Sequence, residues 1–259
     1  MTLRFFLYAV AFPILFLSTV GCSPTPPSPT VETAASALQQ VDVQHYGPMR
    51  EVMRMGKTEA RILLSDAIEK PHAFAVGALE NLEGEIMVID GDVWTARPDQ
   101  DSGQILAGPN LTEGEAATLL TLAHVEHWQA TILDSSSSIP QLEKQIASYA
   151  SSQGIDTNQP FPVMIKGDAS QLDLHVVNGY CPVAIDPATR EAKPWRCATN
   201  EAKVTLVGFY ARDSAGVLTH HTSCLHLHAL AEIDGRTLMG HIDAVTLQPG
   251  AELFVPHFQ

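Results

Sequence analysis

Three histidines near the C-terminal end of the sequence have the spacing of a shared metal site. His226 and His228 are two residues apart, so in a strand both side chains would point to one face, about 7 Å apart. Asp234-Gly235, which follows, is typical of a two-residue hairpin turn. Counting outward from that turn places His241 opposite His228, at a Cβ separation of about 5 Å. The pattern therefore predicts a β-hairpin on which three imidazoles converge.

Three neutral imidazoles are a common ligand set for a catalytic Zn²⁺, whose fourth position stays open. A His-x-His motif alone is more often a pair of solvent-facing histidines on a strand. The third histidine, His241, makes a metal site the favoured interpretation here. In the same register Asp243 would lie across from His226 and could orient an imidazole. Cys224 shares the strand face, either as a fourth ligand or as a small buried hydrophobe, and we favour the hydrophobe.

The N-terminal residues have the pattern of an export signal. Arg4 precedes a short apolar run over residues 5–17, and small residues then lead to Cys22. This resembles the processing site of bacterial lipoproteins, so we expect a signal peptide over 1–21 and a lipid on Cys22, with a simple cleaved signal as the alternative. Residues 22–40 are rich in Pro, Ser and Thr and predict a tether. The protein is then exported and lipid-anchored at the bacterial cell envelope, at the outer membrane or on the periplasmic face.

Composition limits the partners and the redox setting. The chain carries 29 acidic and 15 basic residues, a net charge of −14, and has no basic stripe, so nucleic acid is not expected as a partner. About 220 residues remain after the tether, enough for a sizeable core. In an oxidising compartment Cys181 and Cys197, which bracket a Pro-rich loop, are expected to form a disulfide worth roughly 3 kcal/mol.

The pattern of apolar residues predicts the elements that position the histidines. Residues 116–128 fit a strand or a helix by periodicity, and we favour a strand on which His124 and His127 fall on opposite faces. Helices are expected after Pro48, ending at Gly56, and over 141–150; further strands are expected over 73–79, 85–90, 161–165, 172–177 and 204–210. The methionines of the first helix are expected in the core.

The order of several motifs resembles the α-acetolactate decarboxylase family. The motifs are Leu82-Glu-Gly-Glu-Ile-Met-Val-Ile-Asp-Gly91, Thr205-Leu-Val-Gly-Phe209, His226-Leu-His228 and Gly240-His241. The resemblance implies an α+β, β-rich fold over residues 41–259. A mixed-sheet lobe at about 41–158 would precede a β-barrel-like lobe at about 159–259 that carries the three-histidine site. It also implies a possible homodimer.

The resemblance also implies the chemistry. In that family three histidines bind Zn²⁺, which assigns His226, His228 and His241, and Glu85 matches the catalytic glutamate. From the residues alone Glu85 would be an exposed strand glutamate. The family reaction converts 2-acetolactate to acetoin and CO₂. Two departures stand out: His175 occupies the place of a catalytic arginine, and no residue matches a C-terminal glutamate, although Glu252 is near in sequence.

Three hypotheses follow. The leading one is a zinc-dependent carboxy-lyase acting on 2-acetolactate or a related small 2-hydroxy-3-oxo carboxylic acid. A cupin-like metal dioxygenase or isomerase is a second, because His226-x-His228 followed by Glu232 echoes part of a cupin motif. A non-catalytic, zinc-binding surface lipoprotein is the third, and the missing arginine and glutamate motivate it.

Overall fold

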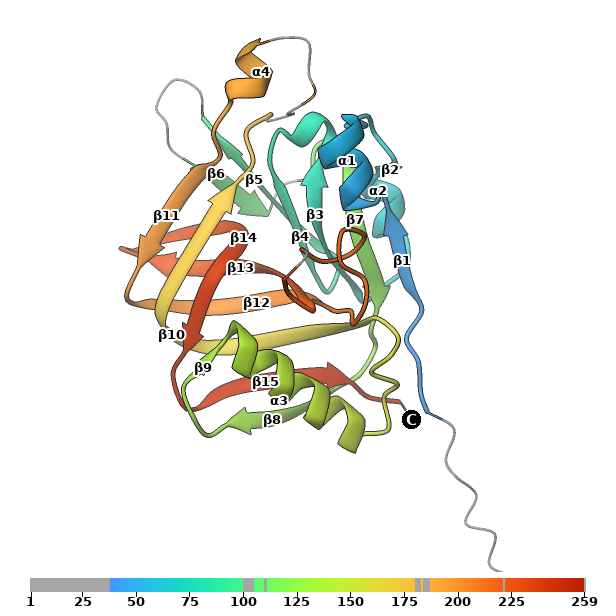
Figure 1. Ribbon diagram of the computed structural model, residues 1–259, viewed down its shortest axis with the longest axis vertical. Coiled ribbons are helices and arrows are strands. Elements are labelled where there is room, and N and C mark those ends of the chain that lie inside the picture. Colours follow the sequence, from blue (N-terminus) through green and yellow to red (C-terminus); the bar gives the residue numbers. More distant parts are fainter. Residues whose placement is uncertain are drawn as a thin grey trace, which may run out of the picture. The chain divides into compact units, whose positions relative to one another are not determined.

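The computed structural model describes residues 38–99, 105–109, 111–179, 183, 187–220 and 222–258 (Figure 1). The expected signal peptide, Cys22, most of the tether and Cys181 lie outside these residues, so the predictions made for them stay predictions. The fold has begun by Gln39, slightly before the expected start at residue 41. The Gln39 amide donates to the carbonyl of Gly154 at 2.8 Å, and Gln39 forms a bridge with Ile155.

The first sheet is built by the N-terminal half of the domain. Its seven strands have the order β1-β7-β3-β4-β5-β6, with β2 paired to β7. They are β1 (Val43–Tyr46), β2 (Ile62–Leu63), β3 (Ala73–Leu79), β4 (Glu85–Ile89), β5 (Asp92–Pro98), β6 (Ile105–Pro109) and β7 (Ala116–His124). This sheet was expected to be mixed, but every pairing between its named strands is antiparallel.

Strand β7 is the segment whose periodicity fits either a strand or a helix, and the strand prediction is confirmed. Eight of its nine residues are buried, so the alternation that would mark a half-exposed strand is absent. The strand ends at His124, before the expected end at Trp128, where the next strand begins.

The second sheet has eight strands in the order β8-β15-β10-β12-β13-β14-β9, with β11 paired to β10. They are β8 (Trp128–Leu133), β9 (Ser137–Ser138), β10 (Phe161–Val176), β11 (Trp195–Thr199), β12 (Ala202–Tyr210), β13 (Leu225–Ile233), β14 (Arg236–Leu247) and β15 (Ala251–Pro256). Strand β10 also pairs with β14, so β10, β12, β13 and β14 close into a small barrel, as expected for the C-terminal lobe.

Strand β10 joins two segments that were expected as separate strands. Its residues 161–169 pair with β12, and residues 169–175 pair with β14. The pairing register with β14 shifts between Ala169 and Gln171. A β-bulge of this kind bends a strand, which lets one long strand serve two neighbours on the barrel.

The helices flank the sheets. They are α1 (Met49–Met55), α2 (Leu64–Ala67), the 3₁₀ helix η1 (Glu80–Leu82), α3 (Ile139–Ser152) and α4 (Pro187–Glu191). As predicted, α1 begins after Pro48 and ends at Gly56, which is left-handed at φ 63°. Helix α3 buries Leu142, Ile146 and Ala150 and packs over the second sheet, as Figure 1 shows. Within the described residues, no helix is long and apolar enough to cross a membrane.

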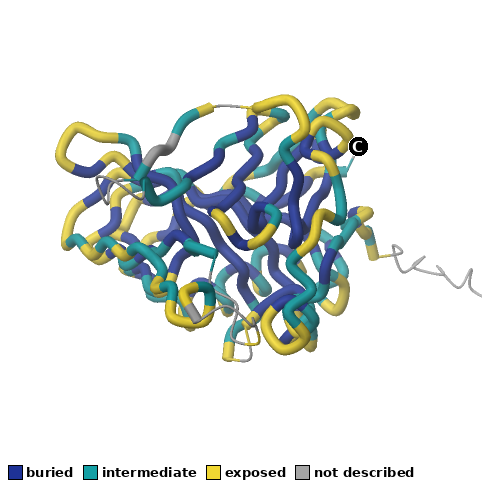
Figure 2. Tube along the Cα trace, turned by 90° about the horizontal axis from the view of Figure 1, so that it is seen from above, coloured by how far each residue is buried: buried dark blue, intermediate teal, exposed yellow. Residues whose placement is uncertain are grey.

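The largest core cluster draws on both sheets. It contains Val76 and Met87 from the first sheet together with Phe161 and Phe209 from the barrel, all at most 1% exposed. Burying side chains of this size contributes about 1.5–3 kcal/mol each. Figure 2 shows the buried segments gathered in the middle of the molecule, with the exposed loops around them. The barrel hairpin therefore rests on a rigid support.

Candidate metal centre and active site

The predicted hairpin is confirmed residue by residue. Asp234 and Gly235, at φ 50° and 71°, form the two-residue turn between β13 and β14, and Ile233 pairs with Arg236. The same register pairs His228 with His241. Both turn residues have positive φ, which is the requirement of a type I′ turn and explains the Asp-Gly sequence.

The three predicted ligand histidines lie close together inside the protein. The ring centroids of His226 and His228 are 5.2 Å apart, those of His226 and His241 are 5.2 Å apart, and those of His228 and His241 are 5.4 Å apart. Ring nitrogens placed 2.0–2.1 Å from a tetrahedral Zn²⁺ would hold the ring centres about 5 Å apart. The spacing therefore fits three imidazoles around one ion.

Burial keeps these imidazoles in the form that binds metal. Burial lowers the pKa of His226 to about 3 and the pKa values of His228 and His241 well below the usual range, so all three are neutral at pH 7. Nδ1 of His226, Nδ1 of His241 and both ring nitrogens of His228 are buried without a well-formed hydrogen bond, and the backbone at Leu218 and Ile86 gives His226 and His228 only weak support. Such atoms are costly unless something binds them, and a divalent metal fits this donor set.

Glu85 is buried beside these rings, although the residue pattern alone predicts an exposed glutamate. It lies at the start of β4, is 3% exposed, and has Oε2 3.7 Å from His228 Nε2. Burial raises its pKa to about 8, although the backbone amide of Val177, which donates to Oε1 at 3.2 Å, acts in the opposite direction. The carboxyl group is therefore held largely protonated at neutral pH.

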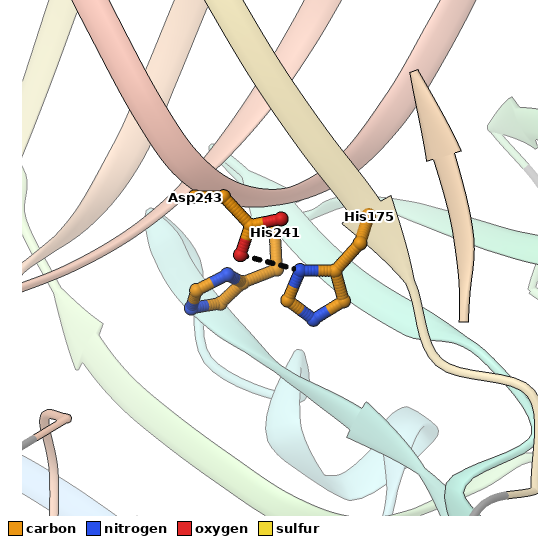
Figure 3. A group of neighbouring side chains, drawn as sticks. All are labelled: His175, His241 and Asp243. Carbon is orange, nitrogen blue, oxygen red and sulfur yellow. Dashed lines mark hydrogen bonds and ion pairs between the residues drawn. The ribbon is translucent and has the colours of Figure 1, made fainter. Parts of the chain in front are cut away.

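His175, from β10, reaches the site at the position opposite His241, with ring centroids 4.8 Å apart. Its Nδ1 is 2.9 Å from Asp243 Oδ1 (Figure 3). Asp243 is also paired with Arg196 of β11. The prediction that Asp243 lies across from His226 is wrong. The β13–β14 pairing stops at His228 and His241, beyond which β14 pairs with β10. Asp243 therefore orients His175 and not His226.

Ligand atoms of His175, His241 and Asp243 lie within 4.8 Å of one another, so these residues form a possible His/His/Asp metal group. However, both carboxylate oxygens of Asp243 already face His175 and Arg196. Burial lowers the pKa of His175, and the neighbouring carboxylate partly offsets this. We therefore regard Asp243 mainly as the group that fixes the ring of His175, with the three buried hairpin histidines as the better donor set.

Two further histidines, which the sequence interpretation missed, lie near the site. His220, in the loop between β12 and β13, has its Nε2 3.2 Å from His241 Nε2. His45 of β1 contacts Thr121 Oγ1 at 3.1 Å, and its positive form would lower the pKa of His226 further. A loop residue has no periodic pattern to place it, so the nearness of His220 to the hairpin in sequence was the only available signal.

A small cavity of about 120 Å³ opens onto these groups. Its polar lining is Glu85, His175, His220, His226 and His241, and its apolar lining is Met49, Val52, Met53, Gly77, Ala78, Leu82, Leu119 and Val177. Pockets for drug-sized ligands have volumes of about 300–1,000 Å³, so this one suits a much smaller molecule. Met49 and Met53 were expected in the core, but they line this cavity, and Met53 is 40% exposed.

The remaining candidates lie outside the cavity. Cys224 is half-buried against the core, in keeping with the hydrophobe interpretation. Cys197 has no disulfide partner among the described residues, but its predicted partner Cys181 lies outside them, so the disulfide stays a prediction. Glu252 of β15 is exposed and pairs with Lys166 and Ile132. His124 Nδ1 lies 3.0 Å from the carbonyl oxygen of Pro71, outside the small cavity.

Three solved structures share this fold. The acetolactate decarboxylase of Bacillus subtilis subspecies spizizenii matches with a TM-score of 0.64 at 17% identity, covering 85% of this chain and 87% of that one. The α-acetolactate decarboxylase of Bacillus subtilis strain 168 matches at 0.63 and 17%, covering 85% and 86%. A Staphylococcus aureus protein of unknown function, similar to α-acetolactate decarboxylase, matches at 0.62 and 16%, covering 85% and 87%.

No curated protein matches the chain in sequence. The family model of α-acetolactate decarboxylase, however, matches residues 47–255, which include both sheets apart from β1 and the last residue of β15, and every residue placed above around the cavity except His45. At 17% identity the structural matches show the fold alone, and the family model adds the relationship in sequence. The chain belongs to the α-acetolactate decarboxylase family.

Proposed function

We propose that this protein is a zinc-dependent carboxy-lyase that removes CO₂ from 2-acetolactate or from a closely related small 2-hydroxy-3-oxo acid. The observation that carries the proposal is the meeting of three neutral, buried imidazoles with a buried, protonated carboxyl group at one small cavity. Membership of the family supports it.

The proposed ligands of the metal are His226, His228 and His241. A divalent ion held there supplies Lewis-acid stabilisation of negative charge on the substrate's hydroxyl and carbonyl oxygens. Zn²⁺ is the expected ion because three imidazoles with one position left over are a common catalytic zinc set.

Glu85 is the proposed proton donor. When the bond to the carboxylate breaks, CO₂ leaves and the electron pair of that bond becomes the enediolate of the remaining fragment. The proton of the Glu85 carboxyl group then adds to carbon, and Glu85 ends the cycle as a carboxylate that solvent must reprotonate. A pKa of about 8 suits this role, because a general acid works best near the operating pH.

His175 is proposed to contact the substrate carboxylate in place of the family arginine. Asp243 fixes its ring, which leaves Nε2 for the substrate. An imidazole offers a weaker and less permanent charge than a guanidinium, so binding of the carboxylate should be weaker than with arginine. The apolar wall formed by Val52, Met53 and Leu119 suits the alkyl groups of a small branched acid.

The proposal includes location and assembly as inferred from the sequence. The folded domain would act outside the cytoplasm, attached to the cell envelope by a lipid on Cys22, and would form a homodimer. The cupin-like alternative loses its basis, because the chain belongs to another family. A non-catalytic zinc protein remains the competing function, favoured by the absence of Lys and Arg among the described residues that line the small cavity.

The test is release of acetoin from 2-acetolactate by the zinc-loaded protein. His226→Ala should lose both the metal and the activity, whereas His127→Ala, at a partly exposed histidine between β7 and β8 that does not line the small cavity, should keep both. Acetoin release by the wild type and by His127→Ala, but not by His226→Ala, would support the proposal. A folded, zinc-loaded wild type that releases no acetoin would favour the non-catalytic function.

A further inference from the structure

We propose that His220 is a fourth imidazole ligand of the metal centre, held in the position that the substrate must take. This inference rests on the metal site proposed above and adds a residue from a different element. The three hairpin histidines come from β13 and β14, whereas His220 comes from the loop that joins β12 to β13.

The distance between the two rings fits a shared ion. His220 Nε2 lies 3.2 Å from His241 Nε2, and the two ring planes are nearly perpendicular, at 85°. Two nitrogens bound to one tetrahedral Zn²⁺ at 2.0–2.1 Å would be about 3.3 Å apart. An ion could therefore bind both nitrogens, and the ring of His220 would then have to move closer to that of His226, since their centroids are 6.4 Å apart.

The loop holds His220 in place through bonds to the first helix. Gly216 and Val217 accept hydrogen bonds from the backbone amides of Arg50 and Met49, at 2.9 and 3.2 Å. These are the first amides of α1, which have no acceptor within the helix. The carbonyl of Ser214 accepts from the amides of Val217, Leu218 and Thr219, which closes the loop into a tight turn. The turn leads directly into His220, so its position is determined by the fold.

His220 and His241 line two cavities. One is the small cavity described above, and the other, of about 320 Å³, is also lined by Ile139, Thr222 and Asp243. A ligand that leaves the metal needs space, and the second cavity, which His220 also lines, offers it. We infer that substrate displaces His220 toward this second cavity, or that the ion becomes five-coordinate when substrate binds.

Metal spectroscopy tests the inference without measuring turnover. X-ray absorption of the zinc-loaded protein should count four imidazoles in the wild type and three in His220→Ala. With Co²⁺ in place of zinc, added azide should change the visible spectrum of His220→Ala at a lower concentration than that of the wild type, because the variant has an open position. His127→Ala is the matched control and should behave as the wild type.

The outcomes separate this inference from the proposed function. Three imidazoles in both proteins, with equal azide binding, would overturn the role of His220 and would leave the three-histidine site intact. In that case the contact with His241 is a hydrogen bond. A wild type that binds neither zinc nor cobalt would overturn both the metal site and this inference. Loss of one imidazole only in His220→Ala would establish the fourth ligand.

Discussion

Glu85 Oε2 and His228 Nε2 face each other at 3.7 Å, and both side chains are at most 4% exposed. Such a pair is an ion pair only if both groups are charged. Burial favours the neutral form of each, since it raises the pKa of Glu85 to about 8 and lowers the pKa of His228 well below its usual range. The contact thus joins a protonated acid and a neutral imidazole, which is the arrangement that proton donation beside a metal ligand requires.

The raised pKa of Glu85 has a consequence for stability. In the unfolded chain the carboxyl group loses its proton above its usual value of 4.5, whereas the folded protein keeps the proton up to about pH 8. The folded state binds more protons in this window, so the contribution of Glu85 to stability falls as the pH rises from about 4.5 to 8. By pH 8 the loss is on the order of 4 kcal/mol.

Glu85→Gln removes this titration while keeping the shape of the side chain. In metal-free protein we expect the free energy of unfolding of the variant, relative to the wild type, to increase from pH 5 to pH 8, measured by urea denaturation. The buried histidines titrate in both proteins and cancel in the difference. A difference that does not change with pH would show that Glu85 is ionised in the fold at an ordinary pKa.

Zinc should stabilise the protein through the three hairpin histidines. A ligand that binds only the folded state adds about 2.7 kcal/mol when present at 100 times its dissociation constant. We expect a higher Tm for the zinc-loaded wild type than for the chelator-treated protein, and little change in His228→Ala. His72→Ala, at an exposed histidine paired with Asp90, is the control and should respond to zinc as the wild type does. An equal zinc response in His228→Ala would contradict the ligand assignment.

His175→Arg should strengthen recognition of the substrate carboxylate. Arginine carries a permanent charge and a forked set of donors. Asp243, which contacts both His175 and Arg196, would lie beside the new guanidinium. The expected result is a lower KM for 2-acetolactate, by about tenfold for a gain of about 1.4 kcal/mol. His175→Lys is the matched variant, with the charge but not the fork, and should gain less. An unchanged or higher KM in the arginine variant would show that His175 does not contact the carboxylate.

Gly208 allows β12 and β13 to approach each other at the metal site. A Cβ atom at this position would lie 1.9 Å from the backbone oxygen of His226, so no side chain fits unless the strands move apart. Gly208→Ala should lower the free energy of unfolding by about 1–3 kcal/mol and also weaken zinc binding. Ile132→Ala, at an exposed position of β8, should stay within about 0.5 kcal/mol. An unchanged zinc affinity in Gly208→Ala would show that the hairpin tolerates the displacement.

The sequence predicted the site best where local rules determine the structure. The Asp234-Gly235 turn fixes the register that pairs His228 with His241, because a two-residue loop leaves no freedom to slip. The same counting failed at Asp243, since β14 changes partner from β13 to β10, a contact between segments far apart in the sequence. No local sequence pattern predicts that a strand will change its pairing strand in this way.

Burial was the other property that the sequence could not supply. Glu85 begins β4 after a turn, where exposure is the ordinary expectation, and it became a candidate only through the family resemblance. Its side chain is nevertheless buried, and the backbone amide of Val177, the residue after β10, donates to Oε1. His220 and the two cavity-lining methionines of α1 were missed for a similar reason. The loop over residues 214–219 and the first helix meet through backbone hydrogen bonds, which depend little on side-chain type.

The most direct test of the account is the handedness of the acetoin formed from 2-acetolactate by the zinc-loaded wild type and by Glu85→Gln carrying the same zinc. A fixed side chain delivers its proton to one face of the enediolate, whereas solvent delivers it to both. We predict one enantiomer from the wild type and a rate lower by about 10²–10⁴-fold in the variant. Racemic acetoin at the uncatalysed rate from both proteins would contradict the account.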